Sequence, residues 1–132
     1  MKILSNIFAP VLYLRNVAEA IDFYSRAFDA REIRRWTNDD GSVHVAEMQI
    51  GNALFHLHEE TARAVRLSPE TLGGTCVELG LFVEDPDAVM KKALEAGAAE
   101  INAMQDYEYG YRQGTLRDPF EHQWTIQKVI AI

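Results

Sequence analysis

The spacing of apolar residues predicts two kinds of element, in an order that occurs twice along the chain. Residues 8–14 are rich in strand formers. From Val17 the apolar positions recur at three- and four-residue intervals, which predicts an amphipathic helix of about three turns with Asn16 as its N-terminal cap. Alternating apolar and polar residues, separated by glycine-containing turns, then predict three antiparallel strands at 32–37, 43–50 and 53–58.

The same order returns after a polar connector that contains Pro69 and two adjacent glycines. The second half predicts a strand at 75–83, a helix at 87–96 and three further strands at 101–104, 111–117 and 123–127. Segments 27–33 and 95–101 are also alike in sequence. We therefore expect one domain, residues 1–132, with a first βαβββ module at 7–58, a linker at 59–74 and a second βαβββ module at 75–129.

Composition excludes several classes of protein. The chain has 132 residues, of which 48% are hydrophobic and 25% charged, so it suits one globular domain and not a disordered chain. Its net charge of -7 argues against binding to nucleic acid or to an anionic membrane surface. The N-terminal residues are too quickly polar for a signal sequence, and Cys76 is the lone cysteine, so we expect a cytoplasmic protein.

Three blocks of sequence, at 20–30, 82–89 and 109–124, carry a family resemblance that covers nearly the whole chain. Together they resemble the vicinal oxygen chelate superfamily, which includes glyoxalase I, bleomycin-resistance proteins and extradiol dioxygenases. The last block is similar to the PhnB-like branch, in which a tyrosine-rich strand runs into an Asp-Pro-Phe-Gly-His-x-Trp turn. Here that turn begins at Asp118, and Glu121 stands in place of the glycine.

The resemblance implies an α+β fold and a homodimer. In that fold, two tandem βαβββ modules form a curved, half-open antiparallel barrel around a cavity. The modules pair either within one chain or by exchange between two chains, and the sequence does not distinguish these arrangements.

The resemblance also implies four metal positions, which fall on Ala9, His56, Glu78 and Thr125. Strand alternation independently places all four on the face turned away from the predicted helices. Only His56 and Glu78 are strong ligands, whereas a divalent ion normally has at least three protein ligands. We therefore expect an incomplete metal site without a resident ion. A bound divalent metal would need a further ligand from one of three inward residues, His58, Gln127 or Cys76.

Glu78 has a second interpretation, as a catalytic general base whose pKa is raised by burial. The alternative is a structural ion pair between Glu78 and His56. Glu47 and His44 lie on opposite faces of one predicted strand, so only one of them faces inward, and the sequence does not say which. His122 is expected to be exposed.

Further ligand-binding candidates lie on the inward faces or near the predicted seventh strand: Tyr13, His58, Phe82, Tyr107, Tyr109, Tyr111, Thr125 and Gln127. The last three tyrosines in sequence, at a spacing of two around Gly110, predict either a lid over a planar ligand or a subunit interface.

These residues favour a small-molecule-binding protein with an incomplete metal site, which sequesters an aromatic or cationic compound. The alternative is a metal-dependent lyase or isomerase resembling glyoxalase I, in which an ion polarises a carbonyl group. A third interpretation is a scaffold domain without a ligand.

Overall fold

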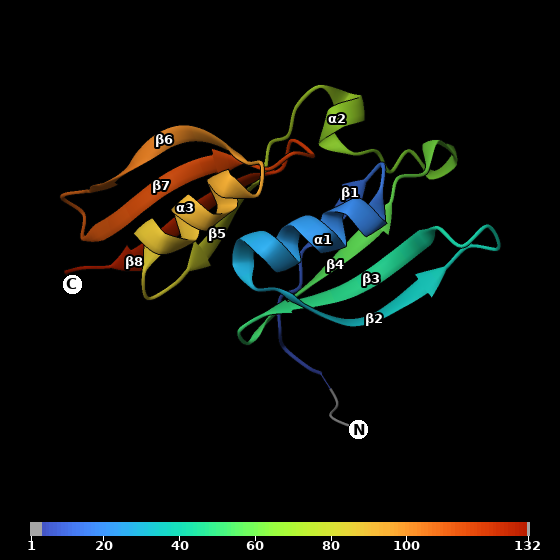
Figure 1. The fold of residues 1–132 in the computed structure, drawn as a ribbon, viewed down its shortest axis with the longest axis horizontal. Coiled ribbons are helices and arrows are strands. Elements are labelled where there is room, and N and C mark those ends of the chain that lie inside the picture. Colours follow the sequence, from blue (N-terminus) through green and yellow to red (C-terminus); the bar gives the residue numbers. More distant parts are fainter. Residues whose placement is uncertain (1–3, 132) are drawn as a thin grey trace.

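The computed structural model describes residues 4–131 and contains two four-stranded sheets with the same topology (Figure 1). The first sheet has the order β1-β4-β3-β2 and consists of β1 (Val11–Leu14), β2 (Arg31–Thr37), β3 (Val43–Ile50) and β4 (Ala53–Glu59). The second has the order β5-β8-β7-β6 and consists of β5 (Glu78–Phe82), β6 (Ala99–Asp106), β7 (Tyr111–Arg117) and β8 (Gln123–Val129). The predicted α+β class and the repeated βαβββ order are confirmed.

One detail of the expected half-open barrel, the antiparallel pairing of all its strands, is wrong. The sheets are mixed and not antiparallel, because β1 pairs with β4, and β5 with β8, in parallel. A helix follows the first strand of each module and carries the chain back across the sheet, which permits this parallel pairing. The two sheets also do not close into a barrel, and β1 and β5 remain free edge strands.

Each module has one amphipathic helix on one face of its sheet. Helix α1 (Val17–Phe28) begins at Asn16, whose side chain accepts a hydrogen bond of 3.1 Å from the Glu19 amide, as the sequence predicts. Helix α3 (Pro86–Glu95) begins after Asp85 and lies within one residue of its predicted start and end. Apolar residues of α1 pack on β3 and β4, and those of α3 pack on β6, β7 and β8.

The linker contains two short helical turns that the sequence analysis does not predict, η1 (Ala62–Ala64) and α2 (Pro69–Leu72). Helix α2 begins in a standard way, since Ser68 caps it and Pro69 occupies its first turn. The predicted strands at 8–14 and 75–83 are shortened to Val11–Leu14 and Glu78–Phe82. Among the described residues, no helix is long and apolar enough to cross a membrane.

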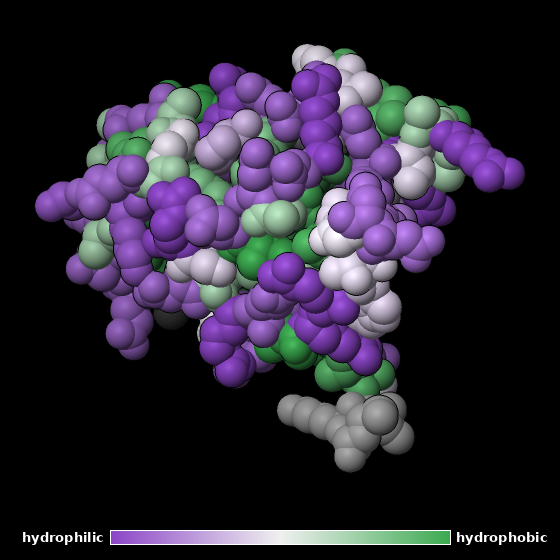
Figure 2. Space-filling view, turned by 45° about the vertical axis from the view of Figure 1, so that its right-hand side comes forward, coloured by the Kyte–Doolittle hydropathy of each residue, from purple (hydrophilic) through white to green (hydrophobic). Residues whose placement is uncertain are grey.

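The two modules share one apolar core, in which the two helices lie against each other. Aromatic rings form much of the contact between the modules. Tyr24 and Phe28 of α1 lie 5.5 and 4.7 Å, between ring centroids, from Trp124 of β8. Charged and polar side chains cover most of the surface shown in Figure 2, with smaller apolar areas between them.

A buried hydrogen-bond network also joins the modules. The Tyr24 hydroxyl of α1 donates to Asp118 in the β7–β8 turn. The same carboxylate accepts bonds of 2.9 Å from Trp124 Nε1, 2.9 Å from the Phe120 amide and 3.0 Å from the His122 amide. Burial raises the pKa of the Asp118 carboxyl, whereas the bonds from Tyr24 and Trp124 lower it. Asp118 thus holds its own turn and fixes α1 against the second module.

Candidate functional site

The sheet face opposite the helix is open in each module, and we call these the open faces of the first and second sheets. Strand alternation places core residues on the helix side and polar residues on the open face, as the sequence predicts. Leu57 is fully buried on the helix side of β4, whereas His56 and His58 are half-buried on the open face. In β8, Trp124 and Ile126 belong to the apolar core, and the side chains of Thr125 and Gln127 line a pocket on the open face.

The open face of the first sheet carries a row of rings. The rings of His56 and His58 are nearly parallel, with centroids 6.2 Å apart. Tyr13 of β1 is opposite His58 in the strand register, and its ring meets the imidazole edge-to-face at 5.6 Å. The three sequence-predicted residues of this sheet therefore lie together.

Glu47 of β3 is a further residue of this face. Of the two candidates on this strand, Glu47 and not His44 therefore lies on the same face as His56. Glu47 is directly opposite His56 in the antiparallel register, so both side chains project from the same face. Its carboxylate forms an ion pair of 2.9 Å with Arg34. His44 lies on the other face, where its Nδ1 is 3.3 Å from Glu59. Strand register supplies this answer, and the sequence alone does not reveal that register.

Arg66 reaches the same face from the linker, and the sequence analysis does not identify it. Its Nη1 donates a hydrogen bond of 2.8 Å to the Tyr13 hydroxyl. Backbone hydrogen bonds of 2.8 and 3.0 Å join Thr61 and Arg66 and close the loop between them. Burial lowers the pKa of His58, and the nearby positive groups of His56, His44 and Arg66 lower it further.

The open face of the second sheet contains a polar pocket of about 370 Å³, whose lining includes Glu78, Thr125 and Gln127. Gln113 Nε2 donates a hydrogen bond of 2.7 Å to Gln127 Oε1. Gly80 makes room for this amide, because a Cβ at that position would lie 2.8 Å from Gln127 Nε2. Amide and hydroxyl groups thus line the pocket beside Glu78, which is itself exposed, so the expected burial of this carboxylate is wrong.

Four aromatic rings continue from this pocket, and we call Phe82, Tyr111, Tyr109 and Tyr107 the aromatic row. Successive centroids in that order are 5.6, 5.9 and 5.1 Å apart. Tyr107 and Tyr109 line the pocket itself, and the Tyr109 hydroxyl donates to Gln113. Phe82 and Tyr109 remain 56% and 63% exposed, so the row offers aromatic surface to another molecule.

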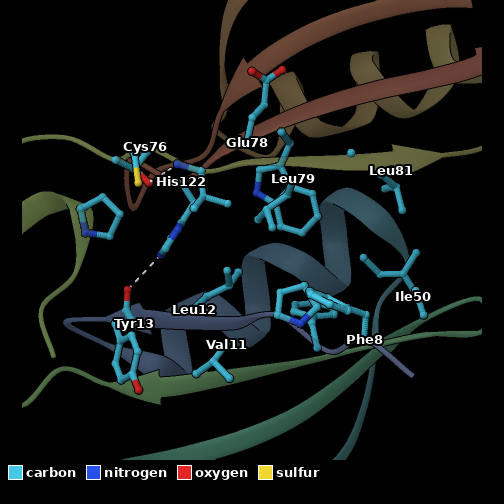
Figure 3. A pocket seen from close by; sticks show the side chains of 18 of the residues that line it. Phe8, Val11, Leu12, Tyr13, Ile50, Cys76, Glu78, Leu79, Leu81 and His122 are labelled. Carbon is cyan, nitrogen blue, oxygen red and sulfur yellow. Dashed lines mark hydrogen bonds between the residues drawn. The ribbon is translucent and has the colours of Figure 1, made fainter. Parts of the chain in front are cut away.

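A larger apolar cavity of about 670 Å³ lies between the modules, bordered by the edge strands β1 and β5 (Figure 3). His122 is buried at one end, and its Nε2 donates a hydrogen bond of 3.0 Å to the Tyr13 carbonyl. The expectation that His122 is exposed is therefore wrong, because its ring reaches the other module. Cys76 also lines this cavity and is an exposed free thiol.

One chain does not bring His56 and Glu78 into a common pocket. Figure 3 shows Glu78 and the Tyr13 ring pointing in opposite directions, away from the cavity between them. His56 lies on the face that Tyr13 shares, one pleat from His58. Within residues 4–131, no three His, Cys, Asp or Glu side chains lie close enough to hold a metal ion. Within the part of the chain that the structure describes, the donors of a single chain do not fit a divalent ion, and the expectation that no ion is resident stays a prediction.

Comparison with known proteins agrees with this architecture. The profile of the Glyoxalase/Bleomycin resistance protein/Dioxygenase superfamily matches residues 6–126, so the chain belongs to that superfamily. It is 37% identical over 121 residues to an uncharacterized protein of Mycobacterium bovis, a match that covers 89% of this chain and 80% of the relative.

Solved structures show the same fold at lower identity. TioX from Micromonospora sp. ML1 is 23% identical, with a TM-score of 0.73 over 96% of this chain and 98% of its own. A bleomycin-binding protein complexed with bleomycin is 16% identical, with a TM-score of 0.68 over 94% of this chain and 98% of its own.

Proposed function

We propose that this chain is a small-molecule-binding protein that holds an aromatic compound against the aromatic row. The observation that carries the proposal is the continuous series of four exposed or half-buried rings beside a polar pocket. Aromatic rings bind planar ligands by stacking, while the amide and hydroxyl groups beside them set the orientation. The bleomycin complex of a protein with this fold supports a small molecule as the ligand class. The Asp118–Trp124 turn supports assignment to the PhnB-like branch.

A second copy of the chain is proposed to cover the open faces. The free edges β1 and β5 flank an apolar cavity, and several large apolar side chains around it are exposed, including Phe8 at 97% and Val77 at 57%. Such surface is uncommon on a monomer. The two open faces also differ in charge, since one carries histidines and arginines and the other carries Glu78. A homodimer that pairs unlike faces brings Glu78 of one copy toward the histidines of the other.

Light scattering of the purified protein tests this assembly. We expect a dimer, and we expect Val77→Asp to shift it toward monomer, because a carboxylate in the apolar contact costs several kcal/mol to desolvate. Glu95→Asp, on the outer surface of α3, is the matched control and should leave the dimer intact. A monomeric wild-type protein at micromolar concentration would contradict the proposed assembly.

Fluorescence of N-phenyl-1-naphthylamine, a neutral aromatic probe, tests ligand binding. We expect saturable binding, weakened about threefold to tenfold by Tyr109→Ala, since one aromatic contact contributes about 0.5–1.5 kcal/mol. Tyr109→Phe retains the ring, loses the bond to Gln113 and should bind the probe as wild type does. Equal affinity of wild type and Tyr109→Ala would show that the aromatic row does not hold the probe.

A further inference from the structure

We propose that the open face of the first sheet binds an anionic group of the ligand, a carboxylate, sulfonate or phosphate, through Arg66, His56 and His58. This inference rests on the proposed function, because it assigns the chemical class of the compound that the aromatic row holds. The net charge of the whole chain, -7, by itself favours a cationic ligand. The charge of this one face is different, because it carries Arg66.

Arg66 provides the fixed positive charge. Among residues 4–131 it has no carboxylate partner within 4.0 Å, and its side-chain bond goes to the neutral Tyr13 hydroxyl. Most other arginines are in ion pairs: Arg15, Arg26, Arg34, Arg35, Arg112 and Arg117. A guanidinium with one neutral partner retains several N–H donors for an anion, and such charge-assisted bonds are the stronger kind.

The linker backbone holds Arg66 in this position under strain. Val65, the residue before it, has φ of 55°, a left-handed conformation that is unfavourable for a β-branched side chain. Hydrogen bonds between Thr61 and Arg66 keep the loop closed despite this cost. A strained conformation that the surrounding bonds maintain is typical of a binding loop.

The two histidines extend the donor set across the sheet. Their half-buried rings lie side by side, and Tyr13 connects them to Arg66 through one ring contact and one hydrogen bond. An anion placed beside these rings accepts hydrogen bonds from the imidazole N–H groups and from the Arg66 guanidinium.

Glu47, the carboxylate on this face, does not cancel the positive charge of Arg66. Glu47 is neutralised by Arg34 at 2.9 Å, and the Arg34 guanidinium lies over the Trp36 ring at 4.7 Å. The pocket of the second sheet has the opposite character, because Glu78 is the one charged residue in its lining. In the proposed dimer, the aromatic part of a ligand is therefore expected on the second sheet of one copy and its anionic part on the first sheet of the other copy.

A matched pair of fluorescent probes tests the inference on the purified protein. 8-Anilinonaphthalene-1-sulfonate carries a sulfonate on the same anilinonaphthalene skeleton as neutral N-phenyl-1-naphthylamine. We expect Arg66→Gln to weaken binding of the sulfonate about tenfold and to leave the affinity for the neutral probe unchanged. Arg63→Gln is the matched control, since Arg63 lies in the same linker, has no ion-pair partner among residues 4–131 and makes no bond to Tyr13.

His56→Gln and His58→Gln extend the test to variants outside the strained loop, and each should weaken the sulfonate selectively. Sodium chloride should weaken wild-type binding of the sulfonate and not of the neutral probe. Equal effects of Arg66→Gln and Arg63→Gln on the sulfonate overturn the inference, and the proposed function stands if Tyr109→Ala still weakens the neutral probe. Loss of saturable binding for both probes in wild type overturns both proposals.

Discussion

Removal of one hydroxyl group, by Tyr24→Phe, should measure how strongly the two modules are held together. The Tyr24 hydroxyl is fully buried and donates to Asp118, which lies in the other module. The substitution retains the ring that contacts Phe28, Trp124 and Phe55. It therefore removes the hydrogen bond with little change in apolar packing.

The magnitude follows from the charge and burial of the acceptor. A hydrogen bond to a charged group contributes about 1.5–3 kcal/mol. After the substitution, Asp118 still accepts from Trp124 and two backbone amides, so its charge remains compensated. We expect a loss of about 2 kcal/mol, or roughly 8 °C in Tm. Asp118→Ala should cost more, about 3–5 kcal/mol, because it leaves four buried donors without an acceptor.

Urea denaturation followed by circular dichroism gives the free energy of unfolding for each variant. Tyr107→Phe is the control, because its hydroxyl accepts a bond of 2.8 Å from Gln105 at the surface. That loss should stay within about 0.5 kcal/mol. Equal stability of Tyr24→Phe and Tyr107→Phe would refute the conclusion that the Asp118 network joins the modules.

Three further predictions concern the turn residue Glu121, the pH dependence that His58 causes, and the metal content of the protein. Glu121 has φ of 73°, so Glu121→Gly should raise stability by about 0.5–1 kcal/mol in urea denaturation, since its exposed ion pair with Arg117 contributes little. The lowered pKa of His58 means that the unfolded state takes up a proton first as pH falls through 6.5. Wild-type stability should therefore fall from pH 7 to 5, and His58→Gln should reduce that fall; an identical pH profile for both proteins would contradict it. Elemental analysis should find less than one equivalent of divalent metal, and stoichiometric metal that His56→Ala or Glu78→Ala removes would favour the metal-dependent alternative.

Much of each module is predictable because its signals are local. The helix at Val17–Phe28 follows from apolar spacing and its Asn16 cap, and the structure reproduces both. Alternation along β4 and β8 separates core residues from open-face residues, since side chains of a strand project to opposite faces. His56 and Thr125 therefore lie on the faces that the sequence predicts.

Contacts between distant segments account for the residues that sequence analysis misplaces or misses. His122 is buried because it bonds to the Tyr13 carbonyl, which is 109 positions away. The position of Glu47 on the open face follows from its register with His56. The proposed role of Arg66 depends on the conformation of the linker, which brings its side chain to Tyr13. None of these contacts leaves a periodic signal in the chain.

The internal repeat yields two equivalent sheets with unlike open faces. The first presents imidazole and guanidinium groups, and the second presents aromatic rings, amides and Glu78. Because the Asp118 network and the aromatic core fix the modules with these faces turned apart, one chain does not enclose a ligand between its two open faces. If the proposed dimer forms, a ligand that contacts both faces should bind the dimer and not the monomer, and by mass action its binding should also stabilise the dimer. In that proposed dimer, ligand affinity and assembly should be coupled, because the same two open faces serve both.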